Sequence, residues 1–70
     1  MINCGIIGYG KMGRIRARAI AESGLGVVSA VYDKVPPDDA PGRVVNDERE
    51  ILSDPEIDAI FVCTPNYRIV

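Results

Sequence analysis

The sequence predicts an α/β domain built on a parallel, doubly wound β-sheet. Three observations predict it: short β-branched apolar segments recur along the chain, helix-forming or polar segments separate them, and a glycine-rich turn joins the first strand to a helix. Strands that alternate with helices form βαβ units, and such units build parallel sheets with right-handed crossovers. The 70 residues, 47% of them apolar and 26% charged, suffice for one small globular domain.

The first two elements are a buried strand and a helix. Residues 2–7 lack polar alternation, which is typical of a strand buried on both faces. Helix-forming residues continue from Lys11 to Ser23, and Gly24 supplies a C-terminal stop. At the helical period of about 3.6 residues, small or apolar residues share one stripe: Gly13, Ala17, Ile20 and Gly24. The helix is therefore expected to lie directly against the sheet.

The middle of the chain contains a second strand and a long turn. Residues 27–33 form the strand by their β-branched content and end on a polar residue. Three prolines in residues 34–42 exclude a helix, so this segment is expected to be a loop. Residues 43–45 are expected to form a very short edge strand.

A short helix and a last strand complete the predicted elements. Asn46 or Asp47 caps the helix, which runs through Leu52 and is closed by Asp54-Pro55. Residues 58–63 form the strand. If this strand returns beside the first one, the strand order reverses between them, and ligands bind in the crevice at such a reversal.

Charge is segregated along the chain, although the net charge is only −2. The first 20 residues carry four cations and no acid, whereas residues 38–58 carry eight acids and two arginines. A nucleic-acid-binding domain is usually basic overall and uses aromatic side chains, which are few here. The pattern favours a small anionic ligand near the first helix. Arg16, which lies near the packing stripe, is expected to extend over the sheet edge.

Several other functions are disfavoured by the sequence. Cys4 and Cys63 lie in apolar segments and are expected to be reduced structural thiols. The chain has no histidine, so no metal site and no catalytic residue is assigned to it. We find neither a bilayer-length apolar run nor a secretory signal, and we therefore expect a cytoplasmic protein.

The turn after the first strand matches the G-x-G-x-x-G dinucleotide-binding fingerprint. It consists of Gly8-Tyr9-Gly10-Lys11-Met12-Gly13. The three glycines would permit a tight turn, close approach of a diphosphate, and close helix-to-strand packing. The helix start would supply N–H groups and positive partial charge for the diphosphate, and Lys11 and Arg14 would add attraction. A plain turn is the alternative, but the position between a strand and a helix supports the fingerprint.

Asp33 is the acid that this fingerprint requires at the end of the second strand. It follows Gly13 by 20 residues, and its carboxylate can accept the adenosine ribose hydroxyls. A carboxylate there repels a 2′-phosphate, which favours NAD, whereas Lys34 could receive that phosphate and bind NADP. NAD is slightly favoured. A solvated acid at Asp33 and a solvated cation at Lys34 are the alternatives.

Together, three segments resemble the N-terminal NAD(P)-binding domain of the glucose-fructose oxidoreductase, inositol dehydrogenase and MocA family. They are Ile6-Ile7-Gly8-Tyr9-Gly10-Lys11-Met12-Gly13-Arg14-Ile15 with Arg18-Ala19, Leu52-Ser53-Asp54-Pro55-Glu56-Ile57-Asp58-Ala59, and Thr64-Pro65-Asn66. The resemblance implies a Rossmann-like domain of an oligomeric oxidoreductase that transfers hydride to or from sugars, polyols or related carbonyl compounds. The candidate cofactor-binding residues are Gly8, Tyr9, Gly10, Lys11, Met12, Gly13, Asp33, Lys34, Thr64, Pro65 and Asn66.

Three departures from the family pattern shape the expectations. Arg16 and Tyr67 stand where the family commonly has histidine, and residues 34–42 replace a helix, which is expected to thin the adenine side of the pocket. The family's catalytic Glu-Lys-Pro segment and substrate domain would follow Val70, so residues 1–70 are expected to be the N-terminal portion of a longer dehydrogenase. The alternatives are a non-catalytic dinucleotide-binding or sensing module and a methyltransferase that uses S-adenosylmethionine, which the glycine spacing disfavours.

Overall fold

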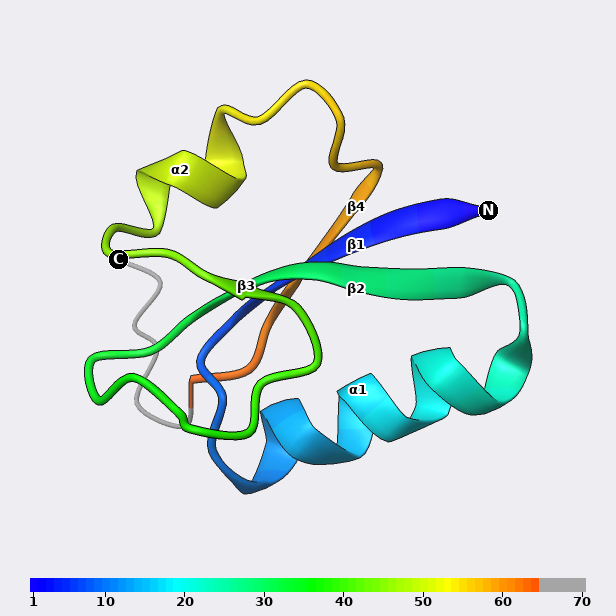
Figure 1. The fold of residues 1–70 in the computed structure, drawn as a ribbon, viewed down its shortest axis with the longest axis horizontal. Coiled ribbons are helices and arrows are strands. Elements are labelled where there is room, and N and C mark those ends of the chain that lie inside the picture. The colour runs from blue at the N-terminus through cyan, green and yellow to red at the C-terminus, as the bar shows by residue number, and fades with distance from the viewer. Residues whose placement is uncertain (65–70) are drawn as a thin grey trace.

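The computed structural model describes residues 1–64, which form one all-parallel sheet flanked by two helices (Figure 1). The elements are β1 (Ile2–Ile7), α1 (Lys11–Ser23), β2 (Gly26–Tyr32), β3 (Arg43–Val44), α2 (Arg49–Leu52) and β4 (Ala59–Val62). The strand order is β3-β2-β1-β4, which confirms the predicted reversal between β1 and β4. In these residues, no helix has the length and apolar character needed to cross a membrane.

β1 is a central strand, buried from its third residue onward as predicted. Successive side chains of a strand point to opposite faces, so Ile6 and Ile7 serve two different cores. Ile6 packs with Ala17 and Ile20 of α1, whereas Ile7 packs with Ile51 of α2. Figure 1 shows the two helices on opposite sides of the sheet. Helices thus cover both faces of the sheet at its centre, as is typical of stable parallel sheets.

α1 has the predicted bounds and lies against the sheet through the predicted stripe. Its buried residues are Gly13, Ala17 and Ile20. Gly24 ends the helix in the left-handed conformation, with a φ of 71°. The Arg16 guanidinium lies 5.4 Å from the centre of the Phe61 ring in β4, which confirms that this side chain extends over the sheet edge.

A β-bulge in β2 changes which residues face α1. Cys4 pairs with Val28, but Gly5 pairs with Ala30, so Ser29 is skipped in the register. Val28 and Val31 consequently pack in the same core as α1. β2 occupies Gly26–Tyr32, one residue earlier at each end than the predicted 27–33.

α2 is a single turn that begins later than predicted. Its N-cap position is Glu48, whose side chain accepts no capping hydrogen bond, rather than Asn46 or Asp47. The Asp47 carboxylate nevertheless accepts the N–H of Arg49 at 2.9 Å. The Glu50 carboxylate accepts the N–H groups of Asn46 and Asp47 at 3.0 and 3.1 Å. The predicted capping chemistry is therefore present, one residue removed from the assigned helix boundary.

In both outer strands, backbone hydrogen bonds to the neighbouring strand continue beyond the residues assigned to the regular strand. β3 has two residues, but the Val45 N–H donates to the Val31 carbonyl at 3.0 Å, which continues the predicted 43–45 strand. β4 has four residues, and the Asp58 N–H donates to the Asn3 carbonyl at 2.7 Å. The Cys63 N–H donates to Ile7 at 2.8 Å. Pairing with β1 thus covers the predicted 58–63.

Candidate functional site

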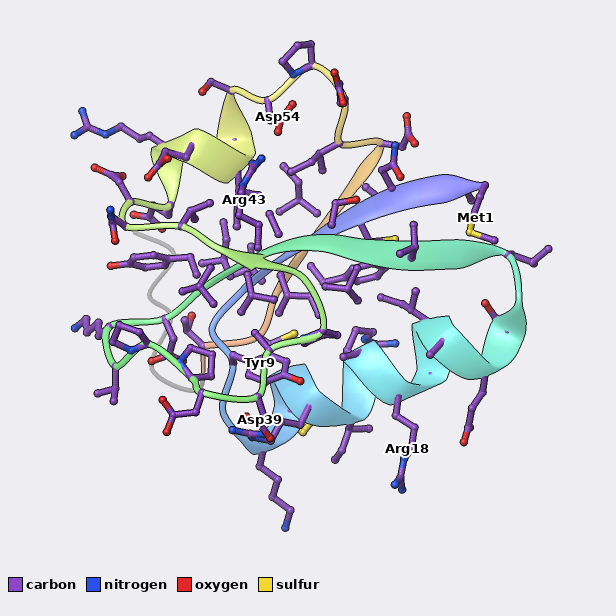
Figure 2. The ribbon with its side chains drawn as sticks, in the orientation of Figure 1. Met1, Tyr9, Arg18, Asp39, Arg43 and Asp54 are labelled. Atoms are coloured by element: carbon purple, nitrogen blue, oxygen red, sulfur yellow. The ribbon has the colours of Figure 1, made fainter. Side chains whose placement is uncertain are left out.

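An open pocket of about 810 Å³ lies at the start of α1, between the turn after β1 and the loop after β2. In Figure 2, Tyr9 and Asp39 lie next to each other at this end of the molecule. The pocket is lined by Tyr9, Gly10, Lys11, Arg14, Asp33, Val35, Pro36, Pro37, Asp38 and Asp39. The proline-rich loop therefore supplies a wall of the pocket in place of a helix.

Two glycines of the turn are required by the packing of the chain itself. Gly8 has a φ of 94°, and a Cβ there would lie 2.8 Å from Cγ2 of Thr64. A Cβ on Gly13 would overlap the carbonyl oxygen of Gly8. These contacts match the tight turn and the close helix-to-strand packing that the fingerprint predicts.

Gly10 has no comparable internal reason to be glycine. Its φ of −86° is open to other residues, and a Cβ there would meet no atom within 4 Å. Gly10 caps α1 without a side chain, and the first backbone hydrogen bond to it comes from Arg14 N–H at 3.0 Å. The N–H groups of Lys11, Met12 and Gly13 consequently have no partner within the helix. The helix start thus offers donors and positive partial charge beside an open space.

Asp33 joins the turn after β1 to the loop after β2. One carboxylate oxygen accepts the Tyr9 N–H at 2.6 Å, and the other accepts the Val35 N–H at 3.0 Å. A carboxylate offers about four lone-pair positions, so both oxygens retain acceptor capacity toward the pocket. Asp33 is half-buried, and these two hydrogen bonds hold its carboxylate in place. It is therefore not the freely solvated acid that the sequence left open as an alternative.

Arg14 bridges α1 and the proline-rich loop. Its guanidinium donates to the Asp39 carboxylate at 2.6 Å and lies 4.7 Å from the centre of the Tyr9 ring. The hydrogen bond from Arg14 lowers the pKa of Asp39 below its ordinary range. The same bond raises the pKa of Arg14. Arg14, which is predicted to add attraction for a diphosphate, is thus paired with an acid in this structure.

Thr64 follows β4 and lies on the other side of the turn, against Gly8. Its Oγ1 is buried and has no hydrogen-bond partner within residues 1–64. A buried hydroxyl without a partner typically costs about 1–3 kcal/mol. Thr64 is therefore a polar group at the predicted strand reversal with an unused donor and acceptor.

The family model described as an oxidoreductase family with an NAD-binding Rossmann fold, named for glucose-fructose oxidoreductase, inositol dehydrogenase and MocA, matches residues 2–68. The chain belongs to this family. The resemblance seen in the sequence is confirmed, and with it a Rossmann fold and an NAD-binding domain of an oxidoreductase. A comparison with curated proteins gave no match.

The structure places the candidate residues of this oxidoreductase-family domain in different positions relative to the pocket. Tyr9, Gly10, Lys11 and Asp33 line the pocket, whereas Gly8 and Gly13 are buried and shape its turn. Met12 and Lys34 are exposed and lie outside the lining, within the part of the chain that the structure describes. Thr64 lies beside Gly8 rather than in the pocket. Pro65 and Asn66, like Tyr67, lie outside the described residues.

Sequence reasoning missed Asp38 and Asp39 as part of the pocket of this family member. Both stand in a proline-rich loop that carries no regular period, and nothing in the sequence indicates that the loop folds back onto α1. The opposite charges of Arg14 and Asp39 were visible, but 25 residues separate them. The two side chains meet because the loop that carries Asp39 lies against the start of α1.

Proposed function

We propose that residues 1–70 form the NAD(P)-binding portion of an oxidoreductase that transfers hydride between a nicotinamide cofactor and a sugar, polyol or related carbonyl compound. Family membership supports the oxidoreductase class and the dinucleotide. The observation that carries the binding site is the open space at Gly10, because no contact within the described chain requires a glycine there. The residues around that space fit the diphosphate and the adenosine of a dinucleotide.

The start of α1 is the proposed diphosphate site. Lys11, Met12 and Gly13 present N–H groups that the helix does not use, and the helix dipole favours an anion at this end. Gly10 lets the backbone approach the phosphates because no side chain occupies the space. The Lys11 ammonium lines the same pocket and adds a positive charge.

The pocket beyond this helix start is the proposed adenosine site. Asp33 lines it and retains lone pairs for ribose hydroxyls. Val35, Pro36 and Pro37 supply apolar surface suited to the face of a base. Because Asp33 lines the pocket and Lys34 does not, this arrangement favours NAD over NADP.

The end of β4 is the proposed site of the nicotinamide half. The Thr64 hydroxyl, which has no hydrogen-bond partner within residues 1–64, lies at the strand reversal beside Gly8. A ribose hydroxyl or carboxamide in this place would supply the missing hydrogen bond. We assign Pro65 and Asn66 to the same half on the family resemblance alone. We assign no catalytic residue to this chain, since none of its groups is argued to act as an acid or a base.

Calorimetric titration with NAD tests the binding proposal, and a Gly10→Ser variant tests its location. Serine is a good N-cap residue, and a Cβ at this position would meet no atom within 4 Å, so the variant should fold. Its side chain would, however, occupy the proposed phosphate space. We expect NAD affinity to fall at least about tenfold. NAD affinity that is unchanged in a folded Gly10→Ser protein would contradict the site.

Turnover with a panel of sugars and polyols tests the remainder of the proposal. The complete protein, mixed with NAD or NADP and each substrate, should produce reduced cofactor for at least one member of the panel. Tight NAD binding without turnover of any member would instead favour the non-catalytic binding or sensing module.

A further inference from the structure

The charges around the proposed adenosine pocket do not suit a phosphorylated ribose. Two cations, Lys11 and Arg14, and three acids, Asp33, Asp38 and Asp39, line it, so the lining has a net charge of −1. A 2′-phosphate would bring about two further negative charges into this lining, whereas the ribose of NAD brings none. The loop that carries Asp38 and Asp39 therefore bears on cofactor choice as strongly as Asp33.

Arg14, one of the two cations of the lining, is paired with this loop. The Arg14 guanidinium makes its 2.6 Å bond to Asp39 while it lies over the Tyr9 ring, so two contacts fix its position. This bond also lowers the pKa of Asp39 below its ordinary value. Arg14 would otherwise be a ready partner for a phosphate, since guanidinium groups bind phosphate oxygens in bidentate fashion.

Lys34 offers no evident replacement for Arg14. It is exposed and lies outside the pocket lining of the described residues, although its neighbour Val35 is within it. Asp33 also differs from Asp39, because both of its oxygens already accept backbone N–H groups and hold the turn in place. A substitution at Asp33 would therefore disturb the fold of the pocket as well as its charge.

We propose that Asp39 is a specificity-determining residue that selects NAD against NADP, by pairing with Arg14 and by adding negative charge to the wall of the pocket. This proposal rests on the proposed dinucleotide site and names the residue that sets its cofactor preference. Asp39 acts through Arg14 and through its own charge, and it contributes no bond to NAD itself. Removal of its charge would free Arg14 to bind a 2′-phosphate.

The test is the affinity of NAD and NADP for the wild-type protein and for Asp39→Asn, measured by calorimetry at low ionic strength. We expect NADP to bind Asp39→Asn at least about tenfold more tightly than it binds wild type, because one repulsive charge disappears and one cation becomes available. NAD affinity should rise less than NADP affinity, since NAD carries a diphosphate but no 2′-phosphate for the freed Arg14 to bind.

A second variant and a matched control together separate the role of Arg14 from a general change of charge. In Asp39→Asn with Arg14→Gln, which has the same net charge as wild type, most of the gain in NADP affinity should disappear. Glu22→Gln is the matched control, because it removes one exposed acid about 12 Å along α1 from Arg14 and outside the pocket lining. It should leave both affinities as in wild type.

The outcomes distinguish the two proposals. If wild type binds neither cofactor, the dinucleotide site itself is wrong. If wild type binds NAD but Asp39→Asn keeps the wild-type ratio of NADP to NAD affinity, the site stands and the role of Asp39 is overturned. An equal gain in Asp39→Asn and in Glu22→Gln would also overturn it, because net charge alone would then explain the effect. An unfolded Asp39→Asn would be replaced by Asp39→Ser, to which the same expectations apply.

Discussion

Glycine in the fingerprint turn serves two different purposes that one motif does not distinguish. Gly8 and Gly13 are required by a positive φ and by close contact with the rest of the chain. Gly10 is surrounded by open space and is explained by a ligand. The spacing of the motif predicted all three positions, but only packing reveals which of them the fold itself needs.

Serine substitutions at Gly13 and Gly10 should separate these purposes. Gly13→Ser should lower the free energy of unfolding by about 1–3 kcal/mol, because its Cβ overlaps the Gly8 carbonyl. Gly10→Ser should change it by less than about 0.5 kcal/mol, since serine is as good an N-cap as glycine. Urea unfolding measures both values. Equal losses in the two variants would show that the turn is packed differently from this description.

The Arg14–Asp39 pair gives a prediction about pH. The pKa of Asp39 is lowered below its ordinary 3.8 in the folded state, chiefly by the Arg14 hydrogen bond. The ionised Asp39 therefore stabilises the folded state above the pKa that Asp39 has in the unfolded chain. This stabilisation is lost as pH falls through the lower pKa of Asp39 in the folded state. Carboxyl NMR titration should show the Asp39 pKa below 3.8 and its return to the ordinary value in Arg14→Gln.

Asp47 supplies the internal control for that titration. Its pKa is also lowered, by hydrogen bonds from Arg49, and this pair is separate from Arg14. The Asp47 pKa should stay lowered in Arg14→Gln. A common shift of both carboxyl groups would point to a change of the whole fold instead of a broken pair.

Among the elements, those with a strong local signal were predictable and those fixed by contacts were not. β1 and α1 match the predicted bounds because apolar runs, a helical stripe and Gly24 define them locally. The bulge at Ser29 and the folding of the loop onto α1 arise from contacts between segments far apart in the sequence. No residue period in the sequence marks them.

The single turn of α2 should depend on one side chain for its docking. Ile51 is fully buried against the sheet, whereas its neighbour Leu52 is 57% exposed. Ile51→Ala should lower the free energy of unfolding by about 2–5 kcal/mol, and Leu52→Ala by less than about 1 kcal/mol. Denaturant unfolding of the two variants measures this difference. Similar losses would contradict the docking of α2 through Ile51.

At the scale of the whole molecule, the strand order was predictable because right-handed βαβ units leave few alternatives. The charge around the pocket was not predictable, since it depends on a loop without regular structure. The sheet also leaves apolar side chains in contact with solvent along β4: in the described residues, Ile60 and Val62 are 37% and 46% exposed. Parallel sheets are normally covered on both faces, so this surface favours association.

A polypeptide of residues 1–70 should consequently be marginally stable and self-associating. Sedimentation velocity should detect dimers or larger species, and their fraction should rise with concentration. Replacement of Ile60 and Val62 by threonine, which keeps the β-branched shape, should reduce that fraction. A monomer with a cooperative thermal transition above about 60 °C, the upper end for mesophilic domains, would contradict this prediction.

The central claim is that the start of α1 binds the diphosphate of a dinucleotide. Titration of ¹⁵N-labelled protein with NAD, followed by amide NMR, tests it most directly, because the free N–H groups are themselves the reporters. The account predicts saturable shifts at Gly10, Lys11, Met12 and Gly13, with little change in α2 on the far face of the sheet. Saturable binding of NAD that leaves these four amides unmoved, or no binding by the folded protein, would contradict it.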